Sequence, residues 1–113
     1  MDVQDPQLLK ADIERRQYRR VKLVAQVQCE ALDRNEIMVT RDVSVGGMFI
    51  NARFPIPIDS ELTLTFRLYP AEPAMACRAK VMFSRIGLGM GIQFTDLSPQ
   101  DQEKLQKFVD EAA

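Results

Sequence analysis

The chain has 113 residues, 46% apolar and 27% charged, a composition typical of one globular domain rather than of a disordered chain. It contains no histidine, which removes the commonest general base and the commonest zinc ligand. The formal net charge is −1, yet five positive charges lie between positions 15 and 22, which leaves the rest of the chain at −6 (−1 − 5).

The first half of the chain predicts three strands. Among residues 1–14, the roughly helical spacing of a few apolar side chains fits a short helix or a docked arm. From Val21 to Glu30 apolar and polar residues alternate, which predicts a half-buried strand. A turn at residues 33–35 precedes a second strand over 36–43. The polar turn from Ser44 to Gly47 separates it from a third over 48–52.

The second half predicts three more strands and a helix. Prolines 55 and 57 interrupt the pattern, and alternation resumes over 62–68, 77–83 and 90–94. Ser98 and Pro99 are typical of a helix start, and an apolar stripe follows at helical spacing. We therefore predict a mainly β fold, a six-stranded antiparallel β-barrel with a C-terminal α-helix.

An arginine cluster precedes the first strand. Its four guanidinium groups occupy positions 15, 16, 19 and 20. A solvated basic patch is the ordinary interpretation of such a run. A generic nucleic-acid binder usually spreads positive charge over a whole face, so a charge concentrated in one place better fits a compact anion.

The turn after the second predicted strand carries the polar sequence Asp42-Val43-Ser44-Val45-Gly46-Gly47. Asp, Ser and Gly favour turns for purely conformational reasons, so the motif alone is weak. Together with the arginines it gains a chemical meaning. Guanidinium groups match phosphate oxygens and the O6/N7 edge of guanine, and a carboxylate accepts from the donor edge of the same base.

Catalysis and metal binding find no support in the sequence. No serine has a histidine to activate it, and Cys29 and Cys77 form no metal-ligand spacing. We expect both cysteines to be buried in a reducing compartment, and we expect no enzyme activity, metal or cofactor. The N-terminus is acidic, and the longest uncharged runs have ten residues, too short to span a bilayer. The expectation is a cytoplasmic protein without membrane insertion.

The two motifs together resemble the signature of the PilZ domain family, receptors for the bacterial second messenger cyclic di-GMP (c-di-GMP). Residues 16–20 match its RxxxR element, and residues 42–47 match its [D/N]xSxxG element. Residues 91–94 look like the family's late GxxF strand, and residues from 97 onward look like its closing helix. The resemblance implies a PilZ-like domain over 14–113, preceded by an N-terminal arm over 1–13.

The resemblance also implies roles for single residues. Arg16 and Arg20 would grip phosphates and the guanine edge, Asp42 and Ser44 would contact base donors, and Gly47 would allow close backbone approach. Arg15 stands where an arginine in the family tends to accompany an intercalated ligand dimer, which favours two ligands per domain. The implied function is a c-di-GMP receptor or adaptor that reorders its N-terminal arm on binding and signals to an unknown effector protein.

Two other functions remain open from the residues. One is a protein-interaction adaptor that keeps the barrel but binds no nucleotide, against which the intact motifs argue. The other is a small nucleic-acid-binding barrel that uses the same arginines. It ranks last because exposed aromatic stacking platforms are not evident in the sequence, and we expect no nucleic-acid partner.

Overall fold

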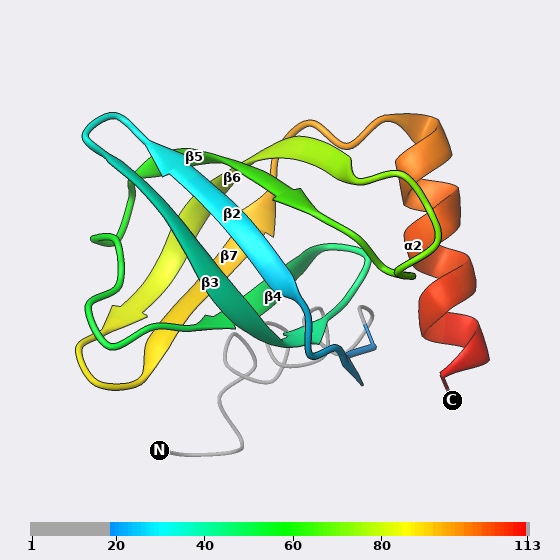
Figure 1. Cartoon of the computed structure of the whole chain (residues 1–113), viewed down its shortest axis with the longest axis horizontal. Coiled ribbons are helices and arrows are strands. Elements are labelled where there is room, and N and C mark those ends of the chain that lie inside the picture. The colour runs from blue at the N-terminus through cyan, green and yellow to red at the C-terminus, as the bar shows by residue number, and fades with distance from the viewer. Residues whose placement is uncertain (1–18, 113) are drawn as a thin grey trace, which may run out of the picture.

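The computed structural model describes residues 19–112, which form seven strands and one helix (Figure 1). The elements are β1 (Val21–Lys22), β2 (Gln26–Ala31), β3 (Arg34–Val43), β4 (Gly47–Asn51), β5 (Glu61–Phe66), β6 (Met75–Arg85), β7 (Gly89–Phe94) and α2 (Pro99–Glu111). Every strand pairing is antiparallel. The expected N-terminal arm, residues 1–13, lies outside the described residues.

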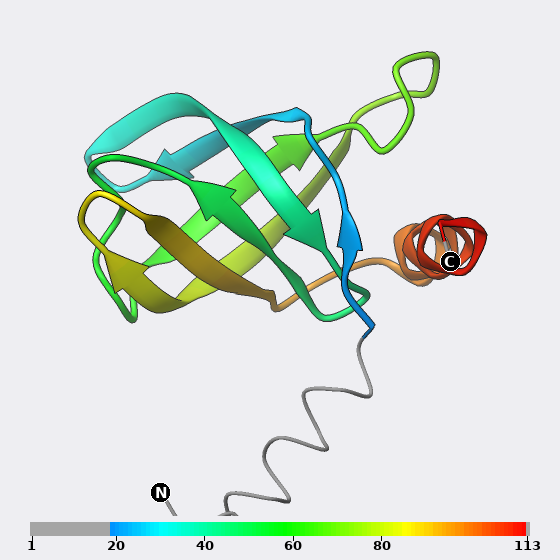
Figure 2. The same ribbon diagram turned by 90° about the horizontal axis from the view of Figure 1, so that it is seen from below.

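Six of the strands close into a barrel. Around the ring the order is β2, β3, β4, β7, β6 and β5, and β5 pairs with β2 to complete it. The short β1 lies outside this ring and pairs with the end of β3, where Val21 faces Val43 and Lys22 faces Asp42. Figure 2 shows the barrel with α2 beside one end. The predicted fold class is confirmed, with β1 as one extra strand.

The barrel interior holds the apolar residues that alternate along the strands. In β5, Leu62, Leu64 and Phe66 are buried whereas Thr63 between them is exposed. Successive side chains of a strand point to opposite faces, so alternation fills the core from one face. Fully buried residues from other strands include Val27, Ile50, Val81 and Met90. One contiguous core therefore runs through the barrel.

Helix α2 adds its apolar stripe to this core. Leu105 and Val109 are buried in the same cluster as the barrel residues. The helix begins where the sequence predicts, because the Ser98 Oγ accepts a hydrogen bond from the Asp101 amide at 3.1 Å and Pro99 occupies the first turn. The helix thereby supports the end of the barrel beside which it stands (Figure 1).

The prediction of a single first strand over 21–30 was wrong, because the chain leaves the ladder between β1 and β2. The buried Thr40 occupies the gap: its hydroxyl donates to the Leu23 carbonyl at 2.5 Å and accepts from the Ala25 amide at 3.0 Å. Val24, between these two residues, is 67% exposed. A side-chain hydroxyl thus replaces ladder hydrogen bonds, which an alternating pattern alone does not reveal.

Candidate functional site

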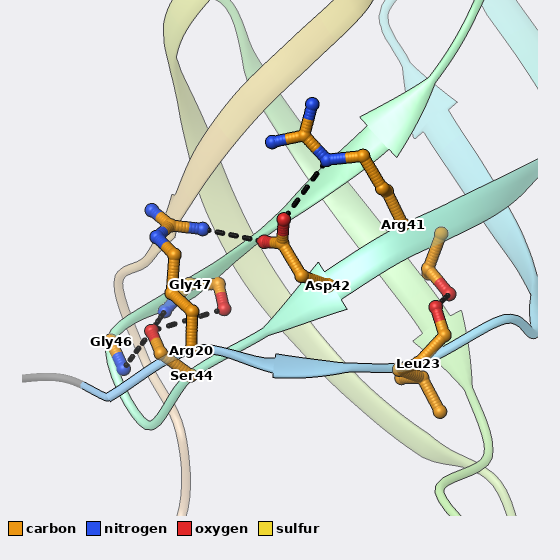
Figure 3. A network of polar contacts seen from close by, with 8 residues as sticks. Arg20, Leu23, Arg41, Asp42, Ser44, Gly46 and Gly47 are labelled. Atoms are coloured by element: carbon orange, nitrogen blue, oxygen red, sulfur yellow. Dashed lines mark hydrogen bonds and ion pairs between the residues drawn. The ribbon is translucent and has the colours of Figure 1, made fainter.

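The turn from Ser44 to Gly47 connects β3 to β4 and is held by the serine side chain. Ser44 Oγ accepts from the amides of Gly46 and Gly47, both at 3.1 Å, and the Ser44 amide donates to the Gly47 carbonyl at 2.8 Å (Figure 3). Ser44 is only 2% exposed. The buried hydroxyl thus finds its hydrogen-bond partners in the backbone of the turn, and these bonds fix the shape of the turn.

Gly47 begins β4 at a point where the backbone of β7 comes very close. A Cβ atom placed on Gly47 would lie 2.0 Å from the Ile92 carbonyl oxygen and 3.3 Å from Gln93 Cα. The strand register explains this approach, since Gly47 is paired directly with Gln93. Close backbone approach at Gly47 is thus present within the barrel itself, between two of its strands.

Asp42 lies next to this turn and forms an ion pair with the chain that precedes β1. Arg20 Nη1 lies 2.8 Å from Asp42 Oδ1, and the two side chains are 52% and 17% exposed (Figure 3). The pairing of β1 with the end of β3 brings them together, because Arg20 stands two positions before Lys22, whose strand partner is Asp42. Residues 22 positions apart in the sequence therefore meet at one corner of the barrel.

A second arginine, Arg41, contacts the same carboxylate. Its Nε donates to Asp42 Oδ2 at 3.0 Å. Neighbouring residues of a regular strand point to opposite faces, but the β3–β4 register shifts between Thr40 and Asp42. Across this bulge Thr40 is buried, Arg41 is exposed and Asp42 is partly exposed. Arg41 could not be identified as part of the site from the sequence, because only the bulge brings its side chain beside that of Asp42.

The barrel surface beside Asp42 is aromatic. The guanidinium carbon of Arg41 lies 3.9 Å from the centroid of the Phe49 ring, and Phe49 is the strand partner of Asp42. The Phe83 ring lies 6.2 Å from the Phe49 ring, and Gly91 pairs with both residues in the ladder. Phe83 is 43% exposed, so an apolar surface continues from the charged corner across β4, β7 and β6.

The structure thus brings together four of the six residues named from the sequence. Arg20, Asp42, Ser44 and Gly47 lie within one corner formed by the end of β3, the start of β4 and the chain before β1. The other two, Arg15 and Arg16, lie outside the described residues. Two guanidinium groups surround one carboxylate at this corner, so the described part of it carries an excess of positive charge.

The two cysteines are unsuited to nucleophilic chemistry. Burial raises the pKa of the Cys29 thiol to about 12, and the nearby Glu36 carboxylate acts in the same direction. Burial likewise raises the pKa of Cys77 to about 12, with Asp96 as a smaller cause. Within residues 19–112 no three His, Cys, Asp or Glu side chains gather as a metal would require. No helix in this part of the chain is long and apolar enough to cross a membrane.

Comparison with known proteins identifies the family. The model of the PilZ domain matches residues 14–111. This match covers most of the chain, and the chain therefore belongs to the PilZ domain family. No curated protein matches the chain.

Solved structures show the same fold at low sequence identity. The PilZ domain of YcgR from Escherichia coli, solved with c-di-GMP, has a TM-score of 0.71 at 16% identity, over 87% of this chain and 91% of that one. The Bacillus subtilis inhibitor of motility, MotI/DgrA, has a TM-score of 0.71 at 20% identity, over 84% of this chain and 49% of that one. PlzA from Borreliella burgdorferi, in complex with c-di-GMP, has a TM-score of 0.64 at 12% identity, over 91% of this chain and 45% of that one. This chain thus spans about half the length of MotI/DgrA and PlzA.

Proposed function

We propose that the chain is a cytoplasmic receptor for c-di-GMP. The observation that carries this proposal is the meeting of Arg20 and Asp42 beside the Ser44–Gly47 turn, which joins the two elements of the family signature at one corner. Similarity in fold to YcgR and PlzA, both solved with c-di-GMP, supports the same ligand. The proposed roles belong to binding and signalling rather than to catalysis.

The chemistry of the corner suits a phosphorylated guanine. The Asp42 carboxylate accepts from the N1–H and N2–H donors of the base, which an adenine does not present in the same arrangement. In the structure, Arg20 neutralises that carboxylate. An incoming ligand would provide phosphate oxygens with which the Arg20 guanidinium can pair instead. Binding therefore exchanges one ion pair for another, and the free energy gained is smaller than the sum of the new contacts. We expect an affinity around micromolar.

The remaining residues of the signature complete the proposed site. Arg16 would act with Arg20 on phosphates and on the O6/N7 edge of guanine, and Arg15 would favour an intercalated pair of ligands. On ligand binding the arm before β1 would become ordered around the ligand. This change would then be transmitted to an effector protein.

We assign Ser44 and Gly47 a supporting part in this site. The Ser44 hydroxyl already bonds the amides of the turn, and Gly47 already lies against the Ile92 carbonyl. Both residues would therefore shape the surface that the base and phosphate meet. Direct contact of Ser44 with the ligand would require its hydroxyl to give up a bond within the turn.

Isothermal titration calorimetry with c-di-GMP tests the proposal on the full chain. We expect Arg20→Ala to weaken binding by roughly 10- to 150-fold, because it removes a charge-assisted contact worth roughly 1.5–3 kcal/mol. Asp42→Ala should weaken c-di-GMP binding and also reduce the preference for c-di-GMP over its adenine counterpart. The stoichiometry of the wild-type titration decides between one ligand and two.

Arg78→Ala is the matched control, because Arg78 also pairs with an aspartate, at 3.8 Å from Asp96 Oδ2, but away from the corner. Its affinity should equal that of the wild type, and circular dichroism should be native for all three variants. Undiminished binding by both Arg20→Ala and Asp42→Ala would exclude this site.

A second function, a protein-interaction adaptor without nucleotide, is favoured by one observation. Both oxygens of Asp42 and the hydroxyl of Ser44 already have partners within the chain, so the corner is stable without a ligand. A wild-type titration without heat at any ligand concentration would support this function over the first.

A further inference from the structure

The two arginines that contact Asp42 are held in different ways. Arg20 makes one contact with the carboxylate, through Nη1 to Oδ1, and no other constraint on its side chain is seen among the described residues; the two arginine side chains are equally exposed, at 52%. Arg41 contacts the other oxygen through Nε and is placed by two further constraints. Of the two partners, Arg20 is therefore the one that a ligand displaces more easily.

The first constraint on Arg41 is the bulge in β3. The shift in register follows directly after Thr40, whose buried hydroxyl is bonded to the backbone at Leu23 and Ala25. Thr40 is fully buried, so the backbone that carries Arg41 is anchored on its N-terminal side. A bulge re-aims the side chains at its position, and here it directs Arg41 and Asp42 to the same face.

The second constraint is the aromatic ring beneath the guanidinium. At 3.9 Å from the ring centroid, Arg41 is in cation–π contact with Phe49. Phe49 is itself 8% exposed and packs beside Phe83 on the outer surface of the barrel. The guanidinium thus rests on a rigid surface while Nε faces the carboxylate.

The geometry points to Arg41 as a specificity-determining residue of this site, which positions the Asp42 carboxylate for the donor edge of guanine. This inference rests on the proposed function. Each carboxylate oxygen has two lone pairs, so Oδ2 keeps its bond from Arg41 and still accepts from the base. Oδ1 exchanges Arg20 for the second donor of the base. Arg41 is thus a positioning residue, and Arg20 is the residue that leaves.

Positioning predicts an effect on base discrimination as well as on affinity. A carboxylate held in one orientation accepts from N1–H and N2–H together, whereas a freely rotating one gains little from the second donor. The hypoxanthine analogue of c-di-GMP lacks only the 2-amino group and therefore measures this second contact. In the wild type we expect the analogue to bind about ten-fold more weakly than c-di-GMP.

The test compares two substitutions of Arg41 by calorimetry with both ligands. Arg41→Met keeps an apolar stem over Phe49 but removes the donor. We expect it to bind c-di-GMP about ten-fold more weakly, so that the ratio of the dissociation constants of the analogue and of c-di-GMP falls to near one. Arg41→Lys restores the charge without a planar group or an Nε donor, so affinity should recover in part while the ratio stays near one. The matched control is Arg53→Met, because Arg53 lies 5.6 Å from the Phe54 ring and its substitution changes the charge equally. It should leave both affinities unchanged.

The outcomes separate this inference from the function on which it rests. Wild-type protein that does not bind c-di-GMP at all removes the proposed function, and this inference with it. If the wild type binds c-di-GMP and the ratio of the two dissociation constants is the same in Arg41→Met and Arg41→Lys as in the wild type, only the inference is removed. Tighter binding by Arg41→Met also overturns it, because Arg41 would then compete with the ligand for Asp42.

Discussion

Substituting Gly47 by alanine separates two reasons for a glycine at this position of the motif. If glycine serves only the approach of a ligand, Gly47→Ala weakens binding and leaves stability unchanged. The structure predicts a loss of stability, because the new Cβ would lie 2.0 Å from the carbonyl oxygen of Ile92. That neighbour is backbone, which cannot rotate away as a side chain would.

The size of the effect follows from how far the strands must separate. Relief to the 3.0 Å that real Cβ atoms require means a displacement of about 1.0 Å (3.0 − 2.0) between β4 and β7. Two adjacent hydrogen bonds would break: the one from the Phe94 amide to the Gly46 carbonyl, which joins the end of β7 to the turn before β4, and the one from the Ser44 amide to the Gly47 carbonyl, which closes the turn that Gly47 would pull away from. Losing both costs about 2 kcal/mol and overpacking about 1–3 kcal/mol, together about 3–5 kcal/mol.

Thermal unfolding followed by circular dichroism measures this loss. A domain of this size has a total stability of about 5–15 kcal/mol, so the variant should still fold, with a Tm about 12–20 °C lower at roughly 4 °C per kcal/mol. Gly91→Ala is the matched control in β7. A Cβ there would lie 3.6 Å from Phe83 Cβ and 3.8 Å from Phe49 Cδ2, both ordinary contacts, and the Tm should hardly change. Equal Tm values for Gly47→Ala and the wild type would refute the reasoning.

Two further predictions concern the core. Thr40→Val should lower the free energy of unfolding by about 2–4 kcal/mol in urea, because it leaves the buried Leu23 carbonyl and the part-buried Ala25 amide without this partner, whereas Thr63→Val on the exposed face of β5 should change it by less than about 0.5 kcal/mol; equal urea midpoints would contradict this. Since burial raises the pKa of Cys29 and Cys77 from 9.0 to about 12, the thiol forms are favoured in the folded state, so this contribution to stability is fully present below about pH 9 and is lost progressively as the pH rises from there through about 12. Both should resist Ellman's reagent in the folded chain at mildly alkaline pH and react in concentrated guanidinium chloride; rapid reaction of a native thiol would disprove their burial.

The sequence was sufficient to predict the barrel and the meeting of its two motifs. Period-two alternation depends only on which face of a strand is buried, so the interior positions in β5 and elsewhere follow directly from it. The resemblance implied that Arg20 and Asp42 act on one ligand, but their direct ion pair was not predicted, because it depends on the pairing of β1 with the end of β3. Whether these residues bind a nucleotide stays a prediction.

The partnership of Arg41 with Asp42 could not be predicted in this way. An Arg-Asp pair in a regular strand points to opposite faces, and no residue type marks the bulge that changes this. The break after β1 is hidden for the same reason, since the alternation from Val21 to Cys29 continues through it. Both irregularities lie beside Thr40, whose hydroxyl finds its partners only when distant parts of the chain have come together.

The hydrogen bonds of the Thr40 hydroxyl with Leu23 and Ala25 also bear on where a ligand-induced change would start. They fasten Leu23 and Ala25 to β3, whereas β1 upstream of them pairs over only two residues. A displacement of Arg20 would therefore first break the two-residue pairing of β1 with β3, and the bonds of Thr40 would keep it from reaching the closed barrel. If the proposed ligand displaces Arg20, residues 19–22 are therefore the part of the described chain that would move first, while the barrel keeps its structure.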